Sequence, residues 1–442
     1  MNVFDLRERL VRDFADYTRS FIHIRDERVR SLVDDELERG LLWPDPIVQL
    51  NPAFESGGTI DDLVAEGLLH ERCAPIFRRS KTPEDPSGEP LRLHRHQREA
   101  IEVARTGANY VLTTGTGSGK SLAYIVPIVD HVLRAGSDKG IKAIVVYPMN
   151  ALANSQLGEL EKFLAIGPPG STGLVRFRRY TGQESHDERE ELQHNPPDIL
   201  LTNYVMLEYI LTRPLGDEKI VKAAQGLRFL VLDELHTYRG RQGADVALLA
   251  RRVREACNAN ELQCVGTSAT LAGPGTVDEQ RAEVARVAGM LFGADVRPEH
   301  VIGRPSAGLP SQPRSAIPLS PERLADRLAE PCPASLDAFL GDPLASWIET
   351  ELGLTQEEGT GRLRRAMPRP ITGQDGAAEQ LAELTAQPLA ECATAIRDTL
   401  LEGHRLDQPE TGFPVFAFRV HQFFSRGETV YASLEDRRPT AT

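Results

Sequence analysis

Apolar and polar positions alternate with different periods in different parts of this chain. Near the N-terminus, apolar residues recur at helical spacing and fall on one face: Leu6, Leu10, Phe14 and Tyr17. Between residues 91 and 302, short apolar runs alternate with helical stretches. The runs that predict strands are 109–113, 142–147, 174–179, 198–202, 228–233 and 263–267. This alternation predicts an α/β fold with a parallel sheet flanked by helices.

The same pattern divides the chain into four segments. Residues 1–80 predict a helical N-terminal segment, and residues 81–302 predict the α/β domain. Residues 303–320 are expected to be a linker, because the stretch from Arg304 to Pro321 carries five prolines. Residues 321–442 predict a mainly helical region, either an insertion or the start of a further domain, with strand-like alternation near 413–420.

Composition narrows the possible partners of the chain. Lys and Arg number 51 against 64 Asp and Glu, giving a formal charge of −13, so binding to nucleic acid would require a local basic groove. The five cysteines form no C-x-x-C pair, and neither a zinc site nor a disulfide framework is indicated. The first residues lack the apolar core of a signal peptide, and no run is long enough to span a bilayer. We therefore expect a cytoplasmic protein with no membrane partner.

The strongest chemical signal is the glycine-rich run at residues 113–121, Thr-Thr-Gly-Thr-Gly-Ser-Gly-Lys-Ser, between a predicted strand and a predicted helix. Backbone N–H groups of such a turn converge on an anion. The run therefore predicts a nucleoside triphosphate site, with Lys120 at the β- and γ-phosphates and Ser121 on Mg²⁺. A glycine-rich turn without a ligand is the alternative. The expected binding residues are Thr114, Gly115, Thr116, Gly117, Ser118, Gly119, Lys120 and Ser121.

An acidic pair, Asp233 and Glu234, follows the apolar run 229–232. A parallel sheet places ligand chemistry at the carboxyl ends of its strands. There Asp233 is expected to hold Mg²⁺ against the phosphates, and Glu234 to orient and deprotonate the attacking water. Taken alone, such a pair is more often a solvated helix cap. Its position downstream of the glycine-rich run favours the catalytic interpretation.

These motifs together resemble the first RecA-like motor domain of a superfamily 2 DEAD/DEAH-box helicase. Residues 114–121 are similar to motif I, with Thr114 where the family most often has alanine or glycine, and residues 233–236 match its Asp-Glu-x-His box. The resemblance implies ATP as the nucleotide and a catalytic role for His236. It also implies that Ser268 and Thr270, in a Ser-Ala-Thr motif, couple hydrolysis to strand movement, and that Gln97 reads adenine.

Two further segments resemble the nucleic-acid face of these motors, and a third segment follows them. Residues 147–156 are similar to motif Ia, residues 180–182 are similar to motif Ib, and residues 202–208 form the next loop-to-helix element. Small amide and hydroxyl residues at helix N-termini suit phosphate contact, although each segment alone is also typical of a helix cap. The expected contact residues are Pro148, Asn150, Ala151, Gln156, Thr181, Gly182, Thr202 and Asn203.

The amino-acid sequences of residues 147–153 and 233–240 resemble one branch of the family. This branch contains the Hrq-type DNA-repair helicases and the large helicases of phage-defence islands. That branch implies DNA rather than RNA. Motors of this family hydrolyse ATP between two RecA-like domains, the second of which supplies arginine fingers. Residues 356–365 superficially match its Gln-x-x-Gly-Arg-x-x-Arg motif, but with the wrong spacing, and a basic turn between helices is the simpler interpretation.

The sequence therefore predicts the first motor domain of a larger or split helicase or translocase. We expect it to bind Mg-ATP and single-stranded or tailed DNA, and to hydrolyse ATP weakly without a second RecA-like domain. A nucleotide-gated module that binds DNA or a protein partner without unwinding is the first alternative. A P-loop kinase or transporter-type ATPase is the second, and the Ser-Ala-Thr motif argues against it.

Overall fold

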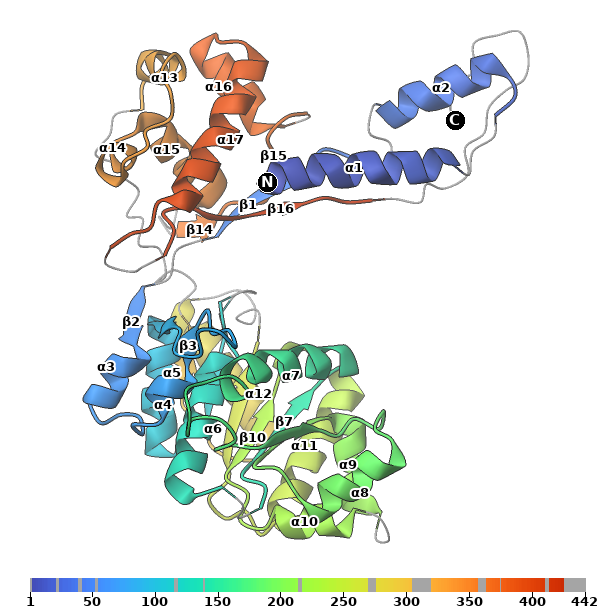
Figure 1. Ribbon diagram of the computed structural model, residues 1–442, viewed down its shortest axis with the longest axis vertical. Helices are drawn as coiled ribbons and strands as arrows, with labels where there is room; N and C mark the ends of the chain where they lie inside the picture. Colours follow the sequence, from blue (N-terminus) through green and yellow to red (C-terminus); the bar gives the residue numbers. More distant parts are fainter. Residues whose placement is uncertain are drawn as a thin grey trace. The chain divides into compact units, whose positions relative to one another are not determined.

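The computed structural model describes residues 2–20, 24–38, 42–51, 55–114, 118–137, 140–213, 217–268, 276–303, 319–356, 363–373, 375–409 and 413–424. Internal contacts divide the chain into two units, Phe54–Ala307 and the combination of Met1–Ala53 with Gly308–Thr442 (Figure 1). The boundaries inferred from sequence, at residues 80 and 302, differ from these. Most of the expected linker, residues 304–318, lies outside the described residues.

The unit Phe54–Ala307 is built on a seven-stranded sheet of order β12-β6-β11-β10-β7-β9-β8. Every neighbouring pair in this sheet is parallel. Each of the strands expected from sequence is present, and the short β12 was not predicted. The strands are β6 (Tyr110–Leu112), β7 (Ala143–Tyr147), β8 (Phe177–Arg179), β9 (Ile199–Asn203), β10 (Phe229–Leu232), β11 (Gln263–Thr267) and β12 (Val301–Ile302).

Helices cover both faces of this sheet, and each face has its own apolar core (Figure 1). Along β10, Phe229 and Val231 enter one core, whereas Leu230 and Leu232 enter the other, because successive strand residues point to opposite faces. The first core takes α5 (Arg95–Thr106), α6 (Leu122–Ala135) and α7 (Asn150–Leu164). The second takes α8 (His186–His194), α9 (Tyr204–Thr212), α10 (Glu218–Ala223), α11 (Gly240–Ala256) and α12 (Val277–Phe292). This is the RecA-like architecture expected from the sequence.

A small N-terminal layer completes the unit. Strands β2 (Ser56–Thr59) and β5 (Arg92–His94) pair antiparallel, and β3 (Arg78–Arg79) pairs antiparallel with β4 (Glu89–Pro90). Helices α3 (Ile60–Ala65) and α4 (Cys73–Ile76) place Ile60, Leu63 and Ile76 in the first core. These contacts attach residues 54–80 to the α/β unit rather than to a separate N-terminal segment.

The other unit combines helices with antiparallel strands. Its three-stranded sheet has the order β15-β1-β16, and β1 (Ile47–Asn51) pairs with both β15 (Arg369–Pro370) and β16 (Ala417–His421). Strands β13 (Leu354–Gln356) and β14 (Leu363–Arg365) form a separate antiparallel pair. The helices of its C-terminal part are α13 (Pro321–Leu328), α14 (Leu336–Leu340), α15 (Pro343–Ile348), α16 (Ala377–Thr385) and α17 (Leu389–Arg405), with the π-helical turn η3 (Glu349–Gly353).

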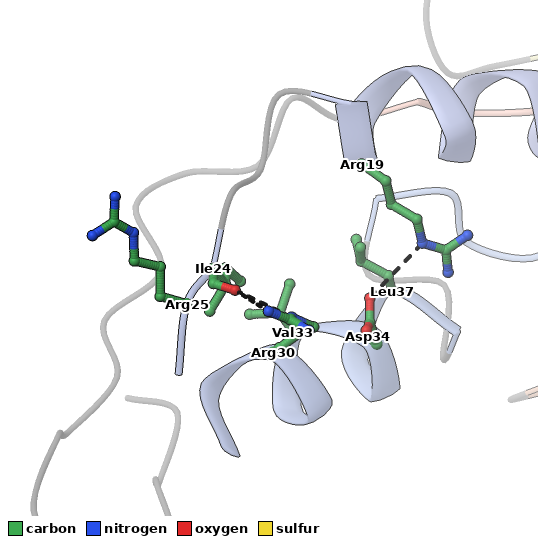
Figure 2. Close-up of a pocket in the computed structure, with 7 residues that line it drawn as sticks. All are labelled: Arg19, Ile24, Arg25, Arg30, Val33, Asp34 and Leu37. Atoms are coloured by element: carbon green, nitrogen blue, oxygen red, sulfur yellow. Dashed lines mark hydrogen bonds and ion pairs between the residues drawn. The ribbon is translucent and has the colours of Figure 1, made fainter. Parts of the chain in front are cut away.

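Two helices open this unit, α1 (Val3–Ser20) and α2 (Glu27–Glu38). The apolar face expected on α1 is only partly buried, because Phe14 packs against Trp43 whereas Tyr17 is 61% exposed. A cavity of about 660 Å³ lies beside these helices, and in it Arg19 pairs with Asp34 at 3.8 Å (Figure 2). No helix among the described ranges is both long and apolar enough to cross a membrane.

Candidate functional site

The glycine-rich turn connects the carboxyl end of β6 to α6. Its base is closed by a hydrogen bond between the hydroxyls of Thr114 and Ser118, whose oxygens lie 2.6 Å apart. Both side chains are buried, with Thr114 at 7% and Ser118 at 0% exposure. Thr114, the unusual residue at the first position of the motif, therefore has Ser118 as a hydrogen-bond partner. Gly115, Thr116 and Gly117 lie outside the described residues, and their roles stay predictions.

The first turn of α5 holds the second half of the glycine-rich turn. His96 donates from Nε2 to the carbonyl of Ser118 at 2.9 Å, and Gln97 donates from Nε2 to the carbonyl of Gly119 at 2.8 Å. The Oε1 atom of Gln97 accepts from the N–H of His94 at 2.7 Å. Gln97 is 2% exposed, so its amide serves the protein itself in this structure, and its contact with adenine stays a prediction.

The acidic pair lies where β10 ends, between β7 and β11. The N–H of Asp233 donates to the carbonyl of Val146 at 2.9 Å, which extends the ladder between β10 and β7 by one residue. On the other side, the hydroxyl of Thr267 donates to Oδ1 of Asp233 at 2.5 Å and accepts from the N–H of Glu234 at 3.0 Å. Thr267, at the end of β11, therefore fixes both acidic residues.

Lys120 approaches this acidic pair from the glycine-rich turn. Its Nζ atom lies 3.5 Å from Oε1 of Glu234, with the lysine side chain 11% exposed and the glutamate side chain 23% exposed. The other carboxylate oxygen of Glu234 lies 3.2 Å from Nδ1 of His236, without the alignment of a hydrogen bond. The structure thus brings Lys120, Asp233, Glu234 and His236 together at one edge of the sheet.

The electrostatics of the site are set by burial. Burial raises the pKa of Asp233, and the charge of Glu234 acts in the same direction. The hydrogen bond from Thr267 and the charge of Lys120 oppose that shift. Glu234 itself has φ 54°, in the left-handed region that residues other than glycine rarely adopt. Such backbone strain is typical of functional sites.

The donor set fits Mg-ATP. Mg²⁺ is commonly bound by one or two carboxylates together with phosphate oxygens and water, and a lysine amine complements the phosphates. Asp233 supplies a carboxylate, and Ser121 stands directly before α6 with a hydroxyl that does not cap this helix. Within the described residues, no group of three or more His, Cys, Asp or Glu side chains is arranged to hold a metal ion by itself. The nucleotide would have to supply part of the coordination.

Of the two expected functional residues in the Ser-Ala-Thr motif, the structure describes Ser268 but not Thr270. Ser268 follows β11, is 6% exposed and donates its N–H to the carbonyl of Leu112 at 2.8 Å. This hydrogen bond extends the ladder between β11 and β6 by one residue. Thr270 lies outside the described residues.

Several of the expected nucleic-acid residues gather at the ends of β7, β8 and β9. Asn203 donates from Nδ2 to Oδ1 of Asn150 at 2.7 Å and to the carbonyl of Thr181 at 3.2 Å. Its Oδ1 accepts from the N–H of Met206 at 2.7 Å, which caps α9. Pro148 precedes α7 and is half-buried, and Ala151, in the first turn of this helix, is exposed. Gln156 is half-buried farther along the same helix.

Other expected phosphate donors are used inside the protein. Thr202 is completely buried and its hydroxyl donates to the carbonyl of Tyr180 at 2.6 Å. The N–H groups of Thr181 and Gly182 donate to Oε2 of Glu184 at 2.9 and 2.8 Å. These groups are therefore occupied by partners within the protein in this conformation, and their contacts with nucleic acid stay predictions.

Comparison with known proteins defines the class of this site. Residues 94–278 match the DEAD/DEAH box helicase family. This range contains the glycine-rich turn, the acidic pair and the Ser-Ala-Thr motif, so this part of the chain is similar to a DEAD/DEAH box helicase domain.

The individual relatives agree with the branch inferred from sequence. The Druantia protein DruE of Escherichia coli is 25% identical over 61% of this chain and 20% of its own length. The ATP-dependent helicase HRQ1 of Saccharomyces cerevisiae is 30% identical over 41% of this chain and 16% of its own length. A crystal structure of the DUF1998 helicase MrfA bound to DNA covers 60% of this chain and 31% of that one, with 25% identity and a TM-score of 0.43. The chain thus spans a fifth or less of the two curated relatives, and it fits the superfamily 2 branch that contains them.

Proposed function

We propose that this chain is the first motor domain of an ATP-dependent DNA helicase or translocase. The observation that carries the proposal is the 3.5 Å approach of Lys120 to Glu234, which joins the phosphate-binding turn and the acidic pair into one site. Residues 94–278, which match the helicase family, contain both parts of this site.

In this proposal, the residues of the site divide the work on Mg-ATP. Lys120 and the N–H groups of the glycine-rich turn bind the phosphates, and Ser121 and Asp233 hold Mg²⁺. When bound there, Mg²⁺ would supply positive charge against the charge that develops on the transferred phosphoryl group. Glu234 orients the attacking water and takes its proton, and His236 lies beside this carboxylate, with Nδ1 3.2 Å from Oε2 of Glu234.

We further propose that ATP hydrolysis by this chain alone is weak. Helicases of this kind complete their site with an arginine from a second RecA-like domain, and such arginines contribute about 10³–10⁵ to turnover. In the described parts of the unit Met1–Ala53 and Gly308–Thr442, every strand pair is antiparallel. Those described parts therefore contain no second parallel sheet of the RecA type.

Substitution of Glu234 by Gln tests the assigned base. The variant keeps the shape of the side chain and is expected to bind ATP normally, while losing most of the ATP hydrolysis measured with and without single-stranded DNA. Glu190→Gln, on the exposed face of α8, is the matched control. If turnover by the Glu234→Gln protein equals that of the control, Glu234 is not the base.

A nucleotide-gated binding module that does not unwind DNA is the second candidate function. The observation that favours it is the internal use of the Thr181 and Gly182 N–H groups by Glu184. Adding a second RecA-like domain in trans distinguishes the two functions. DNA-stimulated ATP hydrolysis that appears on addition supports the motor, whereas hydrolysis that stays unstimulated supports the module. Stimulation by RNA in place of DNA would contradict the proposed substrate.

A further inference from the structure

Two consecutive residues of α5 grip two consecutive carbonyls of the glycine-rich turn. His96 donates to the carbonyl of Ser118 and Gln97 donates to the carbonyl of Gly119, at 2.9 and 2.8 Å. The packing between these segments is tight, because a Cβ atom on Gly119 would lie 2.5 Å from Nε2 of Gln97. Gly119 also has φ +68°, which favours glycine at this position. Helix α5 therefore forms the back wall of the turn.

The direction of these carbonyls fixes the direction of the neighbouring N–H groups. In a planar trans peptide the C=O and the following N–H point in opposite directions. The Ser118 carbonyl faces His96, so the N–H of Gly119 points away from α5. Likewise, the Gly119 carbonyl faces Gln97, so the N–H of Lys120 points away from α5. Two backbone donors are thereby presented on the side of the turn that is not covered by α5.

The protonation and burial of His96 suit it to a stable hydrogen bond with the Ser118 carbonyl. A carbonyl oxygen only accepts hydrogen bonds, so Nε2 of His96 must carry the proton. The side chain is 7% exposed, and burial lowers the pKa of His96 to about 4. The ring is therefore a neutral donor of fixed orientation at neutral pH. Its neighbour His94 stacks against it with ring centroids 5.4 Å apart, which restricts rotation of both rings.

We propose that His96 is a positioning residue for nucleotide phosphates, acting through the Ser118 peptide to aim backbone N–H groups of the glycine-rich turn at the phosphates. This inference rests on the proposed function of that turn. His96 is proposed to act without touching the nucleotide or the metal. Its loss leaves the Ser118 carbonyl without its side-chain donor and lets the peptide rotate, so that part of the phosphate-binding energy is spent on reordering the turn.

The test compares ATP binding by variants at residue 96 in the full chain. His96→Leu removes the donor at similar volume, and His96→Gln keeps an N–H at the position of Nε2. Isothermal titration with Mg-ATP is expected to show about tenfold weaker binding for His96→Leu, since one hydrogen bond to a buried group is lost. His96→Gln is expected to recover most of the affinity. His131→Leu is the control, because this half-buried histidine contacts Phe229 at the other end of β10.

A second measurement separates this inference from the proposed function. Hydrogen exchange of the nucleotide-free protein is expected to be faster at the amides of residues 118–121 in His96→Leu, and unchanged in His96→Gln and His131→Leu. If the wild-type protein binds no ATP, the proposed function fails, and exchange alone decides whether His96 orders the turn. If His96→Leu does not fold, His96→Asn, whose amide is too short to reach Ser118, replaces it. Unchanged affinity and exchange in the variant without the donor, or equal losses in His96→Gln, would overturn the inference.

Discussion

The Nζ atom of Lys120 lies 3.5 Å from Oε1 of Glu234, across 114 residues of sequence. The charge of Lys120 also opposes the rise that burial causes in the pKa of Asp233, so this lysine acts on both carboxylates. Replacing Lys120 by Ala is expected to weaken ATP binding at least about tenfold, since a charge-assisted bond to phosphate is lost. Fluorescence titration with a labelled ATP measures the effect. Lys162→Ala, at an exposed pair with Glu159, should leave affinity unchanged. Equal affinity for ATP in the two variants would show that Lys120 does not bind the nucleotide.

Asp233 is expected to lower the stability of the nucleotide-free protein. Burial raises the pKa of this carboxyl in the folded state, so the unfolded chain ionises it more readily. Ionised Asp233 therefore lowers the free energy of unfolding at neutral pH. This destabilisation disappears as the pH falls and the folded state takes up the proton. Asp233→Asn should therefore raise the thermal midpoint at pH 7 by about 2 °C or more, and by less at pH 4.

The matched control for this prediction is Asp295→Asn, whose side chain is 85% exposed. Differential scanning fluorimetry at both pH values provides the comparison. Asn keeps the oxygen that accepts from the Thr267 hydroxyl, so the hydrogen bond at the end of β11 is retained. A midpoint for Asp233→Asn below that of the wild type at pH 7 would show that the charged form of Asp233 stabilises the fold.

Thr114 should contribute to stability through its hydroxyl. Thr114→Val keeps the shape of the side chain but leaves the hydroxyl of Ser118, which is 0% exposed, without its 2.6 Å partner. The expected cost is about 1–3 kcal/mol in the free energy of unfolding, measured by urea denaturation. Thr212→Val removes a hydroxyl from an exposed helix end, where the expected cost is small. Equal costs at the two positions would mean that the bond at the base of the turn has no net value.

Glu184 should limit the binding of nucleic acid. Its carboxylate accepts from the N–H groups of Thr181 and Gly182 and pairs with Arg179 at 2.9 Å. Glu184→Ala frees two backbone donors and the Nε–H of Arg179 for phosphate contact, while Nη1 of Arg179 keeps its hydrogen bond to Asn154. We expect tighter binding of single-stranded DNA at low salt, with the slope of log affinity against log salt steeper by about one unit.

Fluorescence anisotropy over a salt series measures this slope. Glu190→Ala makes the same change of charge on the exposed side of α8 without opening the two N–H groups. If both variants bind DNA alike, the gain comes from net charge alone, and the Thr181–Gly182 segment takes no part.

The sheet was predictable because burial on both faces leaves a distinct pattern. All four residues of β10 are apolar and buried, and the acidic pair follows directly, so strand and site are visible together in the sequence. The strand β12 was missed because two apolar residues, Val301 and Ile302, do not stand out from their surroundings. The spacing of apolar residues in an amphipathic helix likewise does not indicate which hydrophobic core the helix joins. The sequence therefore predicts α3 as part of the segment 1–80, whereas it packs in the first core of the α/β unit.

The hydrogen-bond partners within the site could not be predicted in the same way. Thr267 reaches Asp233 only because β10 and β11 are parallel neighbours in a particular register, with Leu232 opposite Gly266. Glu184 and His96 act on backbone groups, and no side-chain motif records which carbonyl or N–H they bind. The residue types of the candidate site follow from local pattern, whereas the groups that orient them follow from tertiary packing.

The pairing of β1 with β16 joins residues 47–51 to residues 417–421. The α/β unit lies entirely between these two strands in the sequence. During synthesis, the unit Phe54–Ala307 therefore leaves the ribosome complete while β1 still lacks both of its partner strands. Since domains generally fold as units while the chain is being made, the unit Phe54–Ala307 is expected to fold first. The other unit must then assemble from two pieces of chain. A premature stop shortly before residue 417 would leave β1 paired with β15 alone, and its other edge would be open to aggregation.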